Sequence, residues 1–214
     1  MHSNKIERAP FFDSVKHTIE LAIELSAALP IERRAKLDLI KVYFQASMAE
    51  NKTPQLVFIC THNSRRSHYG QIWAKVMADY FGYPRVKTYS GGTEATAFNP
   101  NAIAALKQQG FKLSCEDEQI DNPIYTAQYG SDFQLSPIYS KKYDAPQNPS
   151  ADFCAIMTCT EADEACPIVF GASSRVSLPY EDPKKSDGTA LQNATYQKRS
   201  LEIASEMAYL FANI

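Results

Sequence analysis

Residues 55–67 read QLVFICTHNSRRS, and this stretch decides how the chain is organised. Residues 55–60 form a short, mainly apolar run behind Pro54, which is typical of a buried parallel strand. The polar loop after it leads directly into a predicted helix, from Ser67 to Phe81, with an apolar stripe. We therefore expect Cys60 at the carboxyl end of a parallel strand, where open sheets bind their ligands.

The chain around this stretch alternates between strand and helix patterns. Further strands are predicted over residues 86–89, 153–158 and 175–178. Asn99 and Pro100 predict a helix start, Gly110 its end, and residues 190–211 form an amphipathic helix. Such alternation implies an α/β fold, a parallel sheet with helices on both faces. One domain over residues 53–214 accounts for all of it.

Two segments lie outside this alternation. Residues 1–52 show helical periodicity from Phe11 to Leu29 and again after Pro30. We expect a helical N-terminal extension, a hairpin packed on the main domain or on a second subunit. Residues 122–150 form a tyrosine-rich insertion with several prolines, expected to be ordered by aromatic packing rather than by regular hydrogen bonds. It could be a lid over a site or a simple wrapping of the surface.

Composition excludes several classes of protein. Lysine and arginine number 22 against 24 aspartates and glutamates, a net charge of −2, which gives no field suited to a nucleic-acid backbone. No apolar run approaches the roughly 18 residues of a membrane span, and residues 1–8 do not resemble a secretory signal. We expect a cytoplasmic protein that acts on neither nucleic acid nor membrane.

The five cysteines are not expected to form a structural disulfide framework, because their number is odd and no export signal is evident. The four histidines are not grouped with these thiols, so no metal site and no cofactor are predicted. Reactive thiols are the more interesting interpretation. Cys115 and Cys154 are expected to be packing residues.

The loop after the first strand carries the predicted chemistry. Backbone N–H groups and the positive end of the following helix converge above Cys60, and a cysteine in such a field is expected to be a thiolate. Arg66 can grip two oxygens of a tetrahedral anion. Ser67 is placed to bond the sulfur and Asn63 to hold the loop. Together these groups predict nucleophilic attack on an oxyanion such as phosphate or arsenate.

Four motifs resemble a known superfamily: LVFICTHNSRRS at 56–67, SGGTEA at 90–95, NPNAIAAL at 99–106 and EDP at 181–183. They are similar to the low-molecular-weight protein tyrosine phosphatases and thioredoxin-coupled arsenate reductases. The resemblance covers most of residues 54–211 and implies a four-stranded parallel sheet flanked by helices, as in phosphotyrosine protein phosphatase I. It also implies that Asp182, before a proline, protonates the leaving oxygen. The predicted oxyanion-binding residues are Thr61, His62, Asn63, Ser64, Arg65 and Ser67.

A second pair of cysteines separates the two branches of this superfamily. Residues 159–167, CTEADEACP, resemble the reductase branch, and the resemblance implies a relay from Cys60 to Cys159 to Cys166, with thioredoxin as reductant. Seven residues of helix rise about 10.5 Å, whereas a disulfide needs Cα atoms within about 7 Å. The segment must therefore be a loop or must unwind on oxidation. The alternative is a phosphatase, acting on phosphotyrosine or another phosphorylated residue through a Cys60 thiophosphate; a non-catalytic anion-binding module is a third reading.

Two positions depart from the pattern of the superfamily. Arg65 stands where Cys or Ala is frequent, so a cation is added beside the predicted anion site. Gln71 stands where many reductases carry a glutamate that helps to bind potassium, which puts that ion in doubt.

Overall fold

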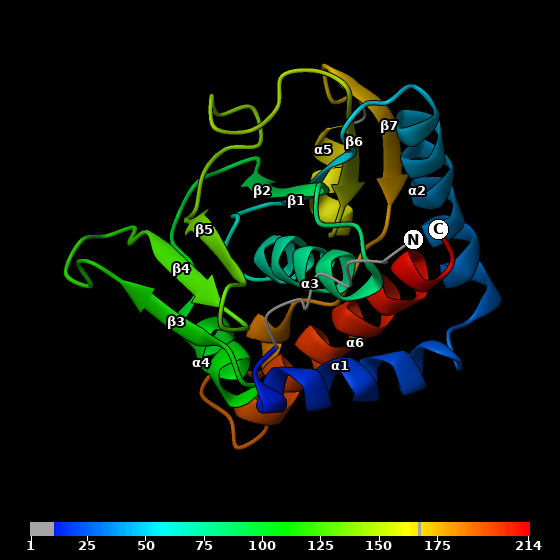
Figure 1. The fold of residues 1–214 in the computed structure, drawn as a ribbon. Coiled ribbons are helices and arrows are strands. Elements are labelled where there is room, and N and C mark those ends of the chain that lie inside the picture. Colours follow the sequence, from blue (N-terminus) through cyan, green and yellow to red (C-terminus); the bar gives the residue numbers. More distant parts are fainter. Residues whose placement is uncertain (1–10, 167) are drawn as a thin grey trace.

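Four parallel strands form the central sheet, in the order β2-β1-β6-β7 (Figure 1). The computed structural model describes residues 11–166 and 168–214. The strands are β1 (Gln55–Cys60), β2 (Lys87–Gly92), β6 (Phe153–Met157) and β7 (Ala172–Ser177). Helices lie on both sides of this sheet, which confirms the predicted fold class. Strand β7 begins earlier than the predicted 175–178.

The alternating side chains of β1 divide the interior into two clusters. Leu56 and Phe58 face the larger one, formed with α3 (Arg66–Phe81), α6 (Gln192–Ala212) and the N-terminal helices. Val57 and Ile59 face the smaller one, formed with the short helix α5 (Thr160–Ala165). Burial on both faces explains why the strand reads as a continuous apolar run.

The N-terminal helices α1 (Asp13–Ser26) and α2 (Ile31–Ala49) pack on the same body as the sheet. Helix α1 lies along α6, and α2 lies against α6 and β7 (Figure 1). Arg33 of α2 donates two hydrogen bonds, at 2.6 and 2.7 Å, to the carboxylate of Glu206 in α6. The two expected helices therefore pack on the chain's own core, but they do not form a hairpin, because each packs against α6 rather than against the other. Residues 1–10 lie outside the described part.

The expectation for residues 122–150 is wrong in one respect, since part of this segment is regular sheet. Strands β4 (Tyr125–Gln128) and β5 (Gln134–Ile138) pair antiparallel, and β4 pairs antiparallel with β3 (Lys112–Cys115). Strands of four or five residues are too short to show a clear alternation of polar and apolar side chains, and Pro137 made residues 134–138 look unlike a strand. A proline is tolerated there because β5 is an edge strand. Aromatic packing is present as well: the rings of Tyr129 and Phe133 stack with centroids 5.8 Å apart.

The predicted ends of α4 (Pro100–Gln108) are confirmed by its caps. The Asn99 side chain accepts hydrogen bonds from the amides of Asn101 and Ala102. Gly110, with a φ of +99°, ends the helix. A short 3₁₀ turn, η1 (Pro183–Ser186), follows Asp182 and leads toward α6.

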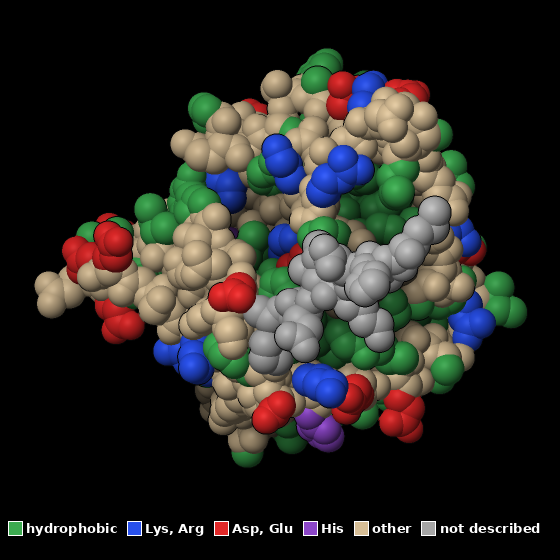
Figure 2. Space-filling view, viewed as in Figure 1, with side chains coloured by type: hydrophobic (Ala, Val, Ile, Leu, Met, Phe, Trp, Pro, Cys, Tyr) green, Lys and Arg blue, Asp and Glu red, His purple; other side chains and the backbone are tan. Residues whose placement is uncertain are grey.

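The surface shows no dominant field on the face seen in Figure 2, where basic and acidic side chains are interspersed. Acidic side chains gather at the far end of the three-stranded sheet, at the left of that view. None of the helices in the described ranges is long and apolar enough to cross a membrane.

Candidate active site

Cys60 lies at the carboxyl end of β1 and is almost fully buried, with 3% of its surface exposed. Its Sγ lies 3.1 Å from Oγ of Ser67, in the first turn of α3. The Ser67 hydroxyl accepts a hydrogen bond of 2.9 Å from Nδ2 of Asn63, so its own proton is free to point at the sulfur. This arrangement gives the Cys60 sulfur a hydroxyl donor at the base of the loop.

Asn63 also anchors the loop from outside. Its φ of +44° is in the left-handed region, which asparagine tolerates better than most residues. Its Oδ1 accepts a 2.8 Å hydrogen bond from the amide of Lys141. Gly92 of β2 comes so close that a Cβ there would lie 2.7 Å from the Asn63 nitrogen. The loop is thus fixed by segments far away in sequence.

The loop carbonyls are engaged by residues that surround the loop. Thr61 O accepts from the amide of Glu94 at 2.8 Å, and His62 O accepts from the hydroxyl of Ser140 at 3.0 Å. Ser64 O accepts from the amide of Asn99 at 3.0 Å. In a planar peptide the N–H points opposite to the C=O. The N–H groups that follow these carbonyls therefore point away from the surrounding residues. Such a set of donors can hold an oxyanion.

Two arginines meet one carboxylate at the mouth of the loop. Arg66 donates from Nη2 to Asp182 Oδ2 at 2.9 Å and from Nη1 to the carbonyl of Tyr180 at 3.0 Å. Arg65 donates from Nε to Asp182 Oδ1 at 2.9 Å and from Nη2 to Oδ2 at 3.3 Å. Both arginines are buried. The added cation, Arg65, therefore forms an ion pair with Asp182.

The ionisation of Asp182 reflects this pairing. Burial by itself acts to raise the pKa of Asp182, but Arg66, the amide of Lys184 and Arg65 act against it. The balance leaves the pKa of Asp182 below its ordinary value, so the carboxyl is ionised while both arginines are its partners.

Cys159 reaches the loop from the start of α5. It is fully buried, and its Sγ lies 3.4 Å from Oγ1 of Thr61 and 3.4 Å from the amide of Ala162, which it caps. Burial raises the pKa of Cys159, although the bonds from Thr61 and Ala162 and the charge of Arg66 act the other way. Its charge also interacts with that of Cys60, and both thiols pack in the smaller core cluster.

Cys166 lies at the opposite end of α5. It is half-buried and packs against the cluster that holds Cys60 and Cys159. Tyr143, from the insertion, contacts it: burial is the main cause that raises the pKa of the Tyr143 hydroxyl, and Cys166 adds to the effect.

A potassium ion at Gln71 does not fit this structure. Gln71 lines a pocket of about 90 Å³ together with Lys141, and an ammonium there repels a cation. Burial lowers the pKa of Lys141 to about 8, which still leaves it mostly charged at neutral pH. Over the described ranges, no group of three or more His, Cys, Asp or Glu side chains is placed to hold a metal ion.

Of the five predicted catalytic residues, four meet at the loop: Cys60, Arg66, Asp182 and Cys159. His62 instead faces Glu94, at 3.8 Å, and its side chain is 44% exposed. Cys166, the fifth, packs against the cluster of Cys60 and Cys159 from the opposite end of α5. Lys141 contacts the loop and was missed, since a single lysine in a loop-like segment carries no pattern.

Sequence comparisons find relatives that are named arsenate reductases. Arsenate reductase of Bacillus subtilis (strain 168) is 29% identical over 160 residues, which cover 74% of this chain and 94% of that protein. Arsenate reductase of Halalkalibacterium halodurans is 31% identical over 134 residues, which cover 63% of this chain and 77% of that protein. No model of a protein family matches the chain.

Among solved structures, a YwlE mutant from Bacillus subtilis has a similar fold. The TM-score is 0.51 at 15% identity, and the match covers 75% of this chain and 98% of that one. At this identity the likeness concerns the fold alone.

Proposed function

We propose that this chain, which belongs to the superfamily of low-molecular-weight protein tyrosine phosphatases and arsenate reductases, is an arsenate reductase with Cys60 as nucleophile. It is an enzyme, and the choice lies between arsenate reduction and phosphoester hydrolysis. The observation that carries the proposal is Cys159, a second thiol against the loop of the first, 3.4 Å from Thr61. A hydrolase has no need of it.

In the first step, the Cys60 thiolate attacks the arsenic of arsenate, an S–As bond forms, and one oxygen leaves as water. The loop amides and Arg66 bind the remaining oxygens, and the Ser67 hydroxyl holds the thiolate before attack. Asp182 supplies the proton to the leaving oxygen.

Binding of the oxyanion prepares Asp182 for this role. Arg66 is bonded to Asp182 in this structure, and an incoming dianion competes for the same guanidinium. Since Arg66 is the strongest of the influences that lower the pKa of Asp182, its transfer to the oxyanion raises that pKa. The negative charge of the substrate raises it further, so the carboxyl can take up the proton that it later donates. Substrate binding thus converts a salt-bridge partner into an acid.

In the second step, the Cys159 thiolate attacks Cys60 Sγ. A Cys60–Cys159 disulfide forms, the S–As bond breaks, and its electron pair stays on arsenic, which leaves as arsenite. Two electrons pass from the two thiols to arsenic. The raised pKa of Cys159 keeps it a thiol before this step, which protects it from earlier oxidation, and its proton passes to an oxygen of the departing arsenite.

In the third step, the Cys166 thiolate attacks Cys159 Sγ. A Cys159–Cys166 disulfide forms, and Cys60 leaves as a thiolate, ready for the next arsenate. An external dithiol protein of the thioredoxin type then reduces the new disulfide and becomes oxidised itself. The half-buried position of Cys166 favours this exchange more than that of the fully buried Cys159.

The alternative is a phosphatase in which water hydrolyses a Cys60 thiophosphate. Cys60, Arg66 and Asp182 would suffice for it, and the hydrogen bonds described between them and their neighbours do not include Cys159. The two functions therefore differ in their demand for the second thiol.

The test compares wild type with Cys159→Ser and with the control Cys115→Ser, a half-buried cysteine on β3. Arsenate-dependent oxidation of NADPH through thioredoxin reductase and thioredoxin measures reduction, and p-nitrophenyl phosphate measures hydrolysis. We expect Cys159→Ser to lose reduction and keep hydrolysis, and Cys115→Ser to keep both. A wild type without arsenate-dependent turnover, but with rapid hydrolysis, would refute the reductase.

A further inference from the structure

The segment between the two relay cysteines is fastened to the edge strand β7. Arg175 donates from Nη2 to the carbonyl of Asp163 at 2.7 Å and to its Oδ1 at 2.5 Å. It also donates from Nε to the carbonyl of Cys166 at 3.1 Å. Ser177, two positions along β7, donates from Oγ to Asp163 Oδ2 at 2.6 Å.

These contacts complete a very short helix. A helix of six residues leaves most of its terminal carbonyls without an intrahelical partner, and it has little stability of its own. Arg175 bonds carbonyls at the C-terminal end of α5, where a positive charge also suits the helix dipole. Cys159 caps the N-terminal end through its thiol. The helical form of this segment therefore depends on the dithiol state at one end and on β7 at the other.

This geometry matters for the third step of the proposed reaction, on which the inference rests. Cys159 and Cys166 are the two caps of α5, and a disulfide needs their Cα atoms within about 7 Å. Seven residues of helix span about 10.5 Å, so α5 must unwind before the bond can form. Unwinding removes the carbonyls of Asp163 and Cys166 from the guanidinium of Arg175.

We propose that Arg175 and Ser177 are positioning residues that hold α5 in its helical form and thereby control the Cys159–Cys166 disulfide. In the helical form Cys159 stays against Thr61, ready for the Cys60 adduct. The same contacts oppose the transfer of the disulfide from Cys60–Cys159 to Cys159–Cys166. In that transfer one S–S bond forms and one breaks, Cys60 leaves as a thiolate, and Cys166 gives its proton to solvent.

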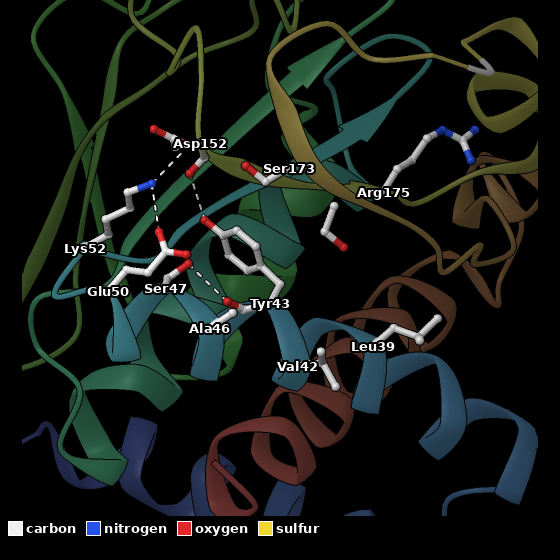
Figure 3. Close-up of a pocket in the computed structure, with 11 residues that line it drawn as sticks. Leu39, Val42, Tyr43, Ala46, Ser47, Glu50, Lys52, Asp152, Ser173 and Arg175 are labelled. Atoms are coloured by element: carbon white, nitrogen blue, oxygen red, sulfur yellow. Dashed lines mark hydrogen bonds and ion pairs between the residues drawn. The ribbon is translucent and has the colours of Figure 1, made fainter.

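Arg175 can be changed with little effect on the Cys60 loop. Arg175 is one of the residues that line a hollow of about 530 Å³ between α2 and β7, together with Tyr43 and Lys52. Figure 3 shows its side chain extending from β7 away from Tyr43 and Lys52. The contacts described above attach it to α5, not to Arg66 or Asp182.

The experiment measures the equilibrium of the Cys159–Cys166 couple in buffers of reduced and oxidised glutathione, with thiols counted after acid quenching and alkylation. The variants are Arg175→Ala, Arg175→Lys and Ser177→Ala, with Ser173→Ala, an exposed serine on the same strand, as control. The contacts favour the dithiol form. We therefore expect Arg175→Ala to shift the equilibrium about tenfold toward the disulfide, a potential about 30 mV more negative.

The other variants define the role more closely. Ser177→Ala should shift the equilibrium in the same direction by a smaller factor, Arg175→Lys should lie between wild type and Arg175→Ala, and Ser173→Ala should match wild type. Hydrolysis of p-nitrophenyl phosphate should stay at the wild-type rate in all four. Equal equilibria in wild type, Arg175→Ala and Ser177→Ala would overturn the proposal. If Arg175→Ala does not fold, Ser177→Ala alone decides.

The glutathione equilibrium needs no arsenate, so this proposal can fail while the proposed function stands. Absence of arsenate-dependent turnover in wild type would refute the function alone. A shifted glutathione equilibrium in Arg175→Ala would then still establish the control of the thiol pair by β7.

Discussion

Replacing Lys141 with methionine should stabilise the protein near neutral pH. The Lys141 side chain is buried, and burial lowers its pKa from 10.5 to about 8. One unit of pKa corresponds to about 1.4 kcal/mol, so this fall means that the buried ammonium lowers the free energy of unfolding by about 3 kcal/mol. The ammonium lies 4.8 Å from the ring centre of Tyr139, a contact worth about 1 kcal/mol that methionine loses. The net gain at pH 7 is therefore about 2 kcal/mol.

The sign of the pH dependence follows from the lowered pKa. Below pH 8 the ammonium is present in both folded and unfolded states, and the full cost applies. Between pH 8 and 10.5 the folded state has lost the proton while the unfolded state keeps it, so the wild type becomes more stable as pH rises. The advantage of the methionine variant should shrink over this range. The main-chain bonds of Lys141 to Asn63 and Gly92 are unaffected by the substitution.

Urea denaturation at pH 7 and at pH 10, with reductant present, measures these free energies of unfolding. The control is Lys142→Met, the same substitution at the neighbouring exposed lysine, which should change stability by less than about 0.5 kcal/mol. A methionine variant at position 141 that is less stable than wild type at pH 7 would refute this reasoning. So would a gain that is equal at both pH values.

Three further changes test the site and its supports. Arg65→Ala removes a cation from Asp182, so the pKa of that carboxyl rises; the alkaline limb of p-nitrophenyl phosphate hydrolysis should move to higher pH, whereas Arg65→Lys should move it less. Burial lowers the pKa of His68 to about 3, so wild type should lose up to about 1.4 kcal/mol per pH unit, relative to His68→Gln, as urea denaturation is repeated from pH 6.5 to 4. Parallel curves would contradict this. Gly92→Ala puts a Cβ 2.2 Å from the carbonyl of Glu94, so both activities should fall about a hundredfold in kcat/KM, and wild-type rates would show that the loop does not depend on this approach.

Several elements could be predicted because their causes are local. The apolar run of β1 and the polar cap at Asn99 stand next to the residues they act on, and the structure places both as expected. The strands β4 and β5 were missed for the opposite reason. Each is short, β5 contains Pro137, and pairing with β3 rather than any period of their own makes them strands.

By itself, then, the sequence determined the strands of the central sheet, the position of Cys60 at the end of a strand, and the presence of the Cys159 and Cys166 pair. Local hydrophobic pattern and caps suffice for these, since they act over a few residues. Only the tertiary structure decided the partners: Asp182 meets Arg66 across 116 positions, and Lys141 meets Asn63 across 78. The tertiary structure also decided the hydrogen bonds from Arg175 to Asp163, because β7 and α5 come together only when the sheet has formed. Contacts between residues far apart in the chain leave no periodic pattern in the sequence. Their effect on the charges and on the thiols therefore can be seen only in the folded structure.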